Sequence, residues 1–468
     1  MKLNSIYVAL LPIVLGSVWM IHGIYHKYLT TESSQEDLPN IVYILSDDQA
    51  WTDYGFMGHP HIQTPNIDKL ASEGLTFTRG YTTAPVCSPS LASIITGLYP
   101  HQHRITGNDP KFEYQGEESG NRKDWLEQRL SHNQKFIDHF YQNPTLPMLL
   151  KQKGYLSFQS GKWWEGSWKD AGFTSGMTYG DPSHGGRHGD EGLKIGREGM
   201  DPIFDFLDEA ESSKSPFFLW YAPFLPHNPH NPPDSLLQKY IGKTPSESIA
   251  KYWAMCEWFD ITVGQLLDEI KDRGMEDNTL VVLVCDNGWI QNPQGNGYEW
   301  PSKQSPYDLG IRTPIIYKWP GRIKPQMDTT HFVSSIDMVP TTLEAVGLEP
   351  NKDMRGINVL NTKKLERRKA VFSQDSHHDM IDVDHPEKSL EHRMILKSPW
   401  KLIVPVRSDQ AGEMTSGGGG LFISVISQVE LYNIVDDPLE KNEISSQHPS
   451  VVKELKKKLD VWWDPGLY

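Results

Sequence analysis

The sequence predicts an α/β protein with a large, mainly parallel sheet flanked by helices, followed by a smaller C-terminal α+β domain. Three observations predict this class: short apolar runs end in polar clusters, helix-like segments alternate with these runs, and the pattern changes beyond residue 380. Buried parallel strands read as continuous apolar runs, and helices between them form right-handed crossovers that cover both faces. With 468 residues the chain is long enough for one large domain and a smaller one.

Residues 1–37 are predicted to be a signal peptide or an N-terminal membrane anchor, followed by a linker. Lys2 precedes an apolar run over residues 6–25, and a polar stretch over residues 30–37 follows it. A run of about 20 apolar residues is long enough to span a bilayer. No clear small-x-small cleavage site is present. A cleaved signal and an uncleaved anchor both stay open, and either leads us to expect an exported, periplasmic or extracellular protein.

Residues 38–380 are predicted to form the large domain. Strands are expected at residues 41–45, 155–158, 217–221 and 279–284, and helices at residues 65–73 and 246–273. Thr64 is expected to cap the first helix, and Gly74 to end it. Each strand is followed closely by polar residues. Because open α/β sheets bind ligands beyond the carboxyl ends of their strands, these polar residues mark the expected site.

Residues 381–468 are predicted to form the C-terminal subdomain. Residues 393–396 and 400–404 flank a turn-like Lys-Ser-Pro and are typical of an antiparallel hairpin. Residues 417–420 are four consecutive glycines and predict a flexible loop. A further strand is expected at residues 429–435 and a closing helix at residues 451–463.

Composition argues against several classes of function. The formal net charge of -15 does not favour nucleic acid as a partner. The three cysteines lack the paired spacing of a zinc or redox motif. The remaining candidates for a zinc site are histidines, and none forms a helix-spaced ligand pair beside a carboxylate. These histidines are His59, His61, His101, His103, His184, His188 and His230.

The segment that begins at Cys87 predicts an anion-binding helix N-terminus. Ser88 is expected to cap the helix, Pro89 suits its first turn and Gly97 its end. Unpaired NH groups and the helix dipole favour an anion such as sulfate or phosphate beside Cys87. The alternative for this segment taken alone is a small buried thiol ahead of an ordinary helix.

Two strand ends together predict a metal site. Asp47 and Asp48 follow the first strand, and Asp286 and Asn287 follow the strand at residues 279–284. Four hard oxygen ligands suit Ca²⁺, with Mg²⁺ as the second choice, and do not suit Zn²⁺. A plain cap or turn is the alternative for either pair alone, whereas a parallel sheet can bring the two pairs together.

Cys87-Ser88-Pro89-Ser90 resembles the signature of type I sulfatases, members of the alkaline phosphatase superfamily. The resemblance implies that a formylglycine-generating enzyme oxidises Cys87 to formylglycine, an aldehyde whose hydrate attacks sulfur. It also implies that Asp47, Asp48, Asp286 and Asn287 are the metal ligands, with residue 87 as a further one. Leu91 stands where the family has an arginine that assists maturation.

The resemblance extends to three further catalytic positions and covers most of the chain. It implies that Lys162, in Gly-Lys-Trp-Trp, and His227, in Pro-His-Asn-Pro, contact the sulfate, and that Lys303 assists the leaving group together with His227. Trp164 replaces the histidine of the family's Gly-Lys-Trp-His. His103 or Arg104, just beyond the signature helix, are the hypothetical substitutes for the missing groups.

The resemblance implies a sulfuric ester hydrolase that acts on a sulfated oligo- or polysaccharide. Sugar stacking is one interpretation of Trp163, Trp164 and Trp168, with Arg187 and His188 as charge-binding neighbours, and core packing of the tryptophans is the other. Two other functions stay open. One is a phosphate or phosphonate ester hydrolase of the same superfamily, and the other is a non-catalytic protein that binds sulfated glycans.

Overall fold

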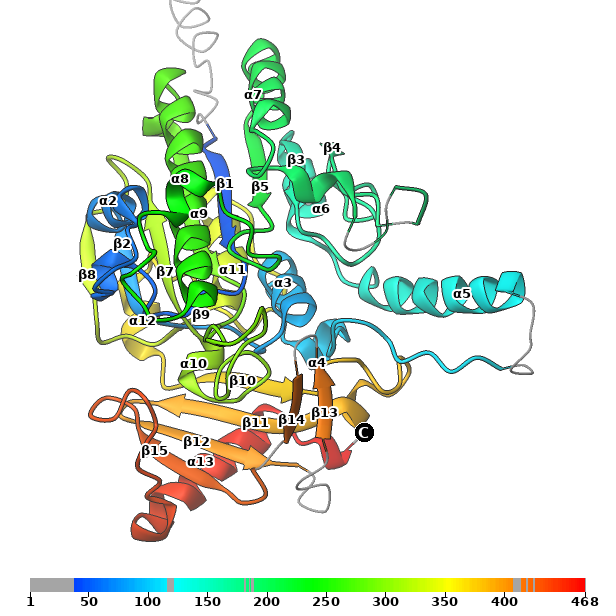
Figure 1. Cartoon of the computed structure of the whole chain (residues 1–468), viewed down its shortest axis with the longest axis vertical. Helices are drawn as coiled ribbons and strands as arrows, with labels where there is room; N and C mark the ends of the chain where they lie inside the picture. The colour runs from blue at the N-terminus through cyan, green and yellow to red at the C-terminus, as the bar shows by residue number, and fades with distance from the viewer. Residues whose placement is uncertain are drawn as a thin grey trace, which may run out of the picture. The chain divides into compact units, whose positions relative to one another are not determined.

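A large mixed sheet forms the centre of the fold (Figure 1). The computed structural model describes residues 38–115, 122–180, 182–184, 186, 189–406, 414–417, 420–423 and 426–467. Within these ranges the strand order is β4-β3-β5-β1-β6-β7-β2-β8, and β9 pairs with β2. The strands are β1 (Asn40–Ser46), β2 (Leu75–Tyr81), β3 (Leu156–Gly161), β4 (Ser175–Gly176), β5 (Phe217–Ala222), β6 (Thr279–Cys285), β7 (Arg312–Lys318), β8 (Gln326–Asp328) and β9 (Val333–Ser334).

The pairing of the central strands confirms the predicted, mainly parallel sheet. Strands β3, β5, β1 and β6 run parallel to one another, and all four were expected from their apolar runs. Strand β7 departs from this pattern because it lies antiparallel to both β6 and β2. The sequence analysis did not predict β2 or β7. The strand predicted at residues 155–158 was also too short, because β3 continues three residues further, to Gly161.

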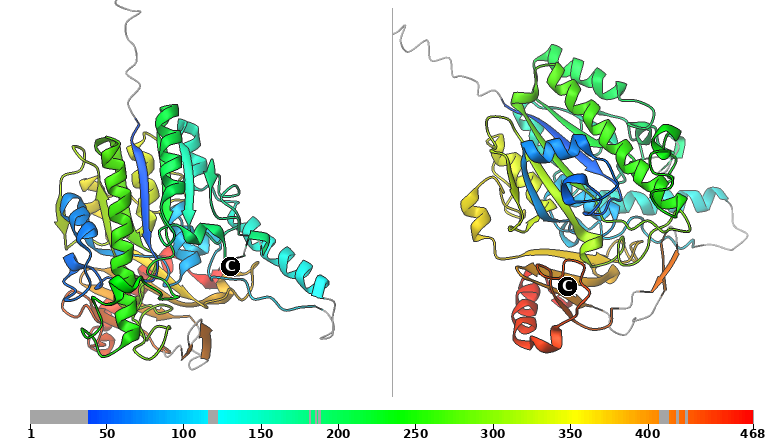
Figure 2. Two further views of the ribbon diagram at one scale, coloured as in Figure 1. Left: turned by 45° about the horizontal axis from the view of Figure 1, so that its top comes forward. Right: turned by 60° about the vertical axis from the view of Figure 1, so that its left-hand side comes forward.

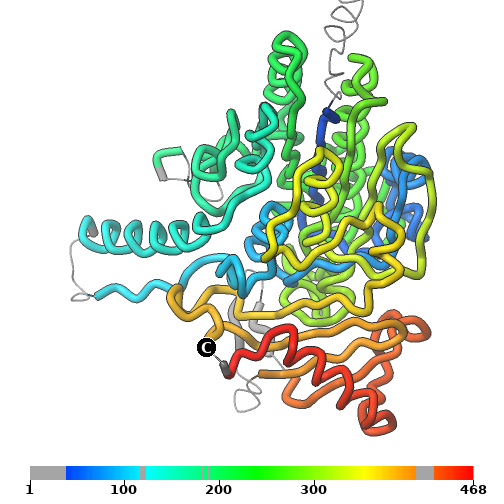
Figure 3. The backbone as a smooth tube through the Cα atoms, turned by 180° about the vertical axis from the view of Figure 1, so that it is seen from behind, coloured from blue at the N-terminus to red at the C-terminus, as the bar shows by residue number. Residues whose placement is uncertain are grey.

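Helices cover both faces of the sheet (Figures 2 and 3). Val42 and Ile44 of β1 pack in one core with α2 (Pro65–Glu73), α7 (Asp201–Ser213) and α9 (Glu247–Asp272). Tyr43, between them in sequence, points to the other face, where its hydroxyl lies 2.7 Å from that of Thr342 in α11 (Met338–Ala345). This alternation follows from the two-residue period of a strand.

The two predicted helices begin and end within a residue of the expected positions, but their N-termini are capped in different ways. Ser246 caps α9, since its hydroxyl accepts the NH of Ile249 at 3.2 Å. Thr64 does not cap α2. Its hydroxyl donates to Asp68, and the carboxylate of Asp260 in α9 accepts the NH of Ile67 at 2.8 Å instead. A neighbouring helix therefore supplies the acceptor that the N-terminus of α2 requires.

One long helix was not expected from the sequence. Helix α5 (Arg122–Phe140) extends sideways from the sheet as the cyan helix in Figure 1. Its sequence is largely polar, so it lacks the apolar stripe by which surface helices are found. The shorter helices are α3 (Cys87–Thr96), α4 (Pro100–His103), α6 (Leu146–Leu150), α8 (Asp234–Leu237), α10 (Asp308–Ile311) and α12 (Thr362–Arg367).

A second, antiparallel sheet confirms the predicted C-terminal α+β region. Its strand order is β10-β11-β12-β15, and α13 (Pro449–Trp462) packs on it. The predicted hairpin is β11 and β12, and β10 begins before residue 380. Residues 417–420 connect a separate pair, β13 and β14, and residues 418–419 lie outside the described residues. The strands are β10 (Val371–Ser376), β11 (Leu390–Lys397), β12 (Trp400–Pro405), β13 (Met414–Gly417), β14 (Gly420–Ile423) and β15 (Glu430–Asn433).

A buried cluster of charges joins the two sheets. Lys401 of β12 is fully buried, and its ammonium group lies 3.0 Å from Asp308 in α10 and 2.7 Å from Glu440. Helix α10 directly precedes β7 of the large sheet. The ion pairs therefore connect the large sheet to the C-terminal one.

The N-terminal prediction concerns residues outside the described ranges. Residues 1–37, with the expected signal peptide or anchor, are not among them. In the described part of the chain, every helix is too short or too polar to cross a bilayer.

Candidate active site

The predicted site residues gather at one edge of the large sheet, beyond the ends of its strands. The register pairs Ser46 of β1 with Cys285 of β6, so Asp47 and Asp286 leave the sheet side by side. Lys162 directly follows β3. Because β7 is antiparallel to its neighbours, the loop that leads into it also lies at this edge. The topology therefore brings residues from these four distant segments to one place.

Asp48 adopts a left-handed backbone conformation that turns the chain directly after β1. Its φ is +66°, which costs a non-glycine residue roughly 1–2 kcal/mol. The turn is held from β6, since the NH of Asp48 donates to Oδ1 of Asp286 at 3.1 Å. The amide of Asn287 donates to Oδ1 of Asp48 at 2.6 Å. The two strand ends thus fix each other's geometry.

Two buried lysines face the carboxylates. The ammonium of Lys162 lies 2.5 Å from Oδ1 of Asp47 and 3.4 Å from Oδ2 of Asp286. That of Lys303 lies 2.6 Å from Oδ1 of Asp48. Burial would raise the pKa of Asp48, but the surrounding positive charges, that of Lys303 first, together outweigh burial and hold this pKa below its usual range. Burial raises the pKa of Asp286 to about 6.

Cys87 is the first residue of α3 and lies against Lys303 and Asn287. Its Sγ is 3.1 Å from Nζ of Lys303 and 3.4 Å from Oδ1 of Asn287. Ser88 was expected to cap this helix, and that expectation is wrong, because the cap position is Val86 and Ser88 donates to Asn108. Burial raises the pKa of the Cys87 thiol to about 12. An unmodified thiol with this pKa is a poor nucleophile.

His227 is fixed with one ring nitrogen towards the carboxylates. Its ring stacks on Phe224 at 4.1 Å, and Nδ1 donates to the carbonyl oxygen of Asn228 at 2.6 Å. In that tautomer Nε2 carries a lone pair, and it lies 3.4 Å from Oδ2 of Asp48. The Nε2 lone pair and the Asp48 carboxylate oxygen repel each other, and a cation bound between them would remove this repulsion.

The donor set fits a divalent metal ion. Asp47, Asp48 and His227 each offer one ligand atom within 4.8 Å of the others, and so do Asp47, Cys87 and Asp286. Oδ2 of Asp47 is buried and has no hydrogen-bond partner among the described residues. Three carboxylates face two ammonium groups, so one negative charge is left over. Hard oxygen ligands and this excess charge favour an ion such as Ca²⁺ or Mg²⁺.

The comparison with family models agrees with this geometry. Residues 39–348, well over half of the chain, match the model described as Sulfatase. The chain belongs to the sulfatase family. Residues 296–416 of this sulfatase also match the model described as N-sulphoglucosamine sulphohydrolase, C-terminal.

Individual sulfatases and related structures give the same result for the fold. N-acetylgalactosamine-6-sulfatase of Canis lupus familiaris is 30% identical over 356 residues, or 67% of this chain and 63% of that protein. The chain thus spans less than two thirds of the length of that relative. A structure of Ps i-CgsB in complex with k-i-k-neocarrahexaose has a TM-score of 0.69 at 22% identity, covering 92% of this chain and 93% of that one. Phosphonate monoester hydrolase of Agrobacterium radiobacter has a TM-score of 0.62 at 16% identity, covering 90% and 94%.

The site of this sulfatase opens into a cavity of about 250 Å³. Five of the predicted residues line it, namely Asp48, Cys87, Lys162, His227 and Lys303. Asp47, Asp286 and Asn287 lie behind them, in contact with Lys162 and Cys87. The other lining residues are Asn108, Asp109, Trp164, Asn228, Trp289, Tyr298, Gln304 and His378.

His378 is the clearest lining residue that sequence analysis missed. Its Nδ1 lies 2.7 Å from Oδ1 of Asp379, and its Nε2 lies 3.1 Å from Nδ2 of Asn108. Asn108 in turn accepts the NH of Ser88, next to Cys87. Asp379 thus sets the tautomer, and Asn108 donates to the other nitrogen. One histidine of a His-His pair, 291 positions after Cys87, gives no sequence signal of this contact.

The two departures from the family signature have different surroundings. Leu91 is buried in the core, while Trp164 lines the cavity, 5.7 Å from Nζ of Lys162 to its ring centre. Neither hypothetical substitute reaches the cavity, because His103 is buried against Ser93 and Arg104 donates to Val383 and Asp384. That hypothesis is therefore wrong.

Only one of the three clustered tryptophans lines the catalytic cavity. Trp163 is fully buried and packs edge-on against Trp220, as core packing predicts. Trp168 packs beside Gly176 and is not in the cavity lining. Arg187 and His188 lie outside the described residues, so their predicted contact with substrate stays a prediction.

Proposed function

We propose that the chain is a sulfuric ester hydrolase that removes sulfate from a sulfated carbohydrate. The observation that carries the proposal is the position of Cys87. It begins a helix, contacts Lys303 and Asn287, and faces the carboxylates of Asp47 and Asp286 in a fold of the sulfatase family. Helix N-termini and lysines stabilise tetrahedral oxyanions, as a sulfate group requires.

Two groups that the chain does not itself encode complete this site in our proposal. Formylglycine formed from Cys87 supplies a hydroxyl nucleophile for the sulfur atom, and a divalent ion, Ca²⁺ before Mg²⁺, offsets charge on the sulfate oxygens. Asp47, Asp48, Asp286, Asn287 and residue 87 would hold the ion. The buried Oδ2 of Asp47 and the excess negative charge support this assignment.

The chain's own side chains bind the transferring group and give a proton to the leaving alcohol. Lys162 and Lys303 supply two positive charges for the transferring group, and Lys303 also lies close enough to residue 87 to stabilise charge on it. Lys303, or His227 once its Nε2 has taken up a proton, gives a proton to the leaving alcohol. Trp164 closes the cavity beside Lys162, in the place of the family's histidine.

A sulfated oligo- or polysaccharide is the proposed substrate class. The name of the canine relative and the saccharide bound to Ps i-CgsB support a carbohydrate. Polar lining residues such as Asn108, His378 and Gln304 can bind sugar hydroxyls, and Trp164 and Trp289 offer faces for stacking. We further propose that a formylglycine-generating enzyme matures Cys87 and that residues 1–37 direct export.

The first experiment is the mass of the tryptic peptide over residues 80–104, from chain co-expressed with a formylglycine-generating enzyme and from the native source. The second is a panel of sulfate, phosphate and phosphonate esters, with Cys87→Ala as the control. The proposal predicts the aldehyde and turnover of sulfate esters that the variant lacks. Preference for phosphorus esters would assign the alternative hydrolase activity, and glycan binding by an unmodified, inactive chain would assign a binding protein.

A further inference from the structure

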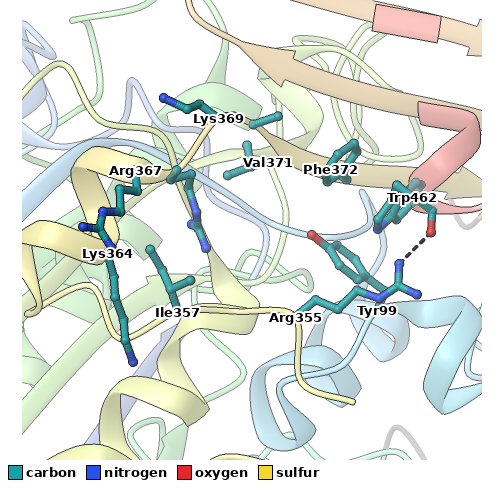
Figure 4. Close-up of a pocket in the computed structure, with 11 residues that line it drawn as sticks. Tyr99, Arg355, Ile357, Lys364, Arg367, Lys369, Val371, Phe372 and Trp462 are labelled. Carbon is teal, nitrogen blue, oxygen red and sulfur yellow. Dashed lines mark hydrogen bonds between the residues drawn. The ribbon is translucent and has the colours of Figure 1, made fainter. Parts of the chain in front are cut away.

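A second pocket, the basic pocket, lies where α12 and the loop before it meet β10 and α13, and it has a volume of about 370 Å³ (Figure 4). Five of its lining residues are basic and none is acidic. They come from the loop before α12, from α12 itself and from the segment that leads into β10. These residues are Arg355, Lys364, Arg367, Arg368 and Lys369.

Among the described residues, carboxylates neutralise two of these five charges. Arg368 forms a two-pronged ion pair with Asp337, and Lys364 lies 2.6 Å from Glu344. Arg355 donates to a neutral group, the carbonyl oxygen of Trp462, at 2.6 Å.

The remaining charges are open to solvent. Arg367 and Lys369 are exposed, and neither forms an ion pair within the described part of the chain. Three positive charges therefore stand together in a chain whose formal net charge is -15. A local positive field held against the overall charge attracts anions.

Aromatic side chains form the opposite wall. In Figure 4, Lys364, Arg367 and Lys369 lie on one side and the rings on the other. Phe372 stacks on Trp462 with ring centres 5.0 Å apart and planes at 6°. Tyr99 meets the edge of Trp462 at 5.0 Å. Cations beside apolar ring surfaces suit a ligand with sulfate groups on a sugar ring.

Strand β10 connects the basic pocket with the catalytic cavity. Phe372, near its start, lines the pocket, and His378, two residues past its end, lines the cavity. Six residues of extended chain span roughly 20 Å. A ligand that reaches both places must therefore be a chain of several sugar units.

We propose that the basic pocket binds a sulfated stretch of the same polysaccharide whose ester is hydrolysed in the catalytic cavity. The inference rests on the proposed function, since it takes its ligand class from there. Binding at a second point raises the effective concentration of ester groups at the cavity. It favours polymers with several sulfates over short fragments.

The test measures binding of the full chain to dextran sulfate, with unsulfated dextran as the control polymer. Arg367→Glu/Lys369→Glu reverses the two exposed charges, and Arg367→Gln/Lys369→Gln removes them more gently. Lys456→Glu/Lys457→Glu is the matched control, because these lysines are equally exposed on α13 and line a different hollow. Hydrolysis of 4-nitrophenyl sulfate reports separately on the catalytic cavity.

We expect the glutamate pair to weaken dextran sulfate binding by about tenfold or more, and the control pair by less than about twofold. The glutamine pair should lie between them, and all variants should hydrolyse the small ester equally. Unchanged binding in the glutamate pair, or an equal loss in the control pair, would overturn the inference. Failure of the proposed function would give a different result. The unchanged chain and all variants would then fail to hydrolyse the sulfate ester, but the glutamate pair would still bind dextran sulfate more weakly than the control pair.

Discussion

The ammonium nitrogen of Lys303 lies 3.1 Å from the Sγ of Cys87. It also lies 2.6 Å from Oδ1 of Asp48, so one buried cation joins the proposed nucleophile to the proposed metal ligands. The loop that carries Lys303 ends in α10, which the C-terminal sheet anchors. The position of this lysine therefore depends on contacts well outside the cavity.

Replacing Lys303 with alanine should lower kcat for a sulfate ester about 10²–10³-fold, because a charge aimed at the transferring group is lost. The peptide over residues 80–104 should still carry the aldehyde. Lys318→Ala is the control, since Lys318 is also largely buried and paired with two glutamates, but lies on β7. An equal loss of activity in both variants would argue that Lys303 acts through stability.

Asp47→Asn should remove tight binding of Ca²⁺. At a Ca²⁺ concentration 100 times the Kd, the unfolding free energy of the unchanged chain should rise by about 2.7 kcal/mol. That of the variant should rise by almost nothing. Metal content by mass spectrometry and the Ca²⁺ dependence of Tm measure this without an activity assay. Asp260→Asn removes a buried carboxylate outside the site and should keep the Ca²⁺ response. A full response in Asp47→Asn would exclude it as a ligand.

His378→Ala should raise KM for a sulfated oligosaccharide about tenfold, with little change for 4-nitrophenyl sulfate, since His378 faces the cavity but does not contact Cys87. Asp379→Asn should have a smaller effect in the same direction, because Asp379 only orients the ring. His377 is adjacent in sequence and does not line the cavity, so His377→Ala should leave KM unchanged. The reverse order of effects would refute a substrate contact for His378.

His101 should make the fold sensitive to acid. Burial lowers the pKa of this ring to about 3, and it stacks on Trp463 at 4.4 Å. The unfolded chain binds a proton there below pH about 6.5, whereas the folded chain does not. The contribution to stability is therefore complete above pH 6.5 and is lost as the pH falls towards 3.

His101→Phe keeps the ring stack and removes this titration. As the pH falls from 7 to 5, the unfolding free energy of the unchanged chain should fall by roughly 2 kcal/mol more than that of the variant. Denaturant titrations at pH 8, 7 and 5 measure the difference. An equal difference in unfolding free energy between the two chains at pH 8, 7 and 5 would show that His101 does not control stability in acid.

The sequence predicted best those features that are local. β1 and β6 were found because apolar runs end directly in Asp47-Asp48 and Asp286-Asn287, and a parallel register then brings the two pairs together. Features fixed by tertiary contacts were missed. Asp260 supplies the acceptor at the start of α2 from another helix, so the local expectation that Thr64 caps it failed. His378 reaches the cavity from a loop that no periodic pattern marks.

The buried ion cluster of Lys401, Asp308 and Glu440 has a consequence for dissecting the molecule. Two of its members lie beyond residue 380 and one before it. Removing a partner from a buried ion pair costs about 3–5 kcal/mol, because the remaining charge stays desolvated. A chain shortened to residue 380 would keep Asp308 without Lys401, the nearer of its two cations, just five positions after Lys303. The two sheets are therefore expected to be inherited, expressed and unfolded together, as one indivisible unit.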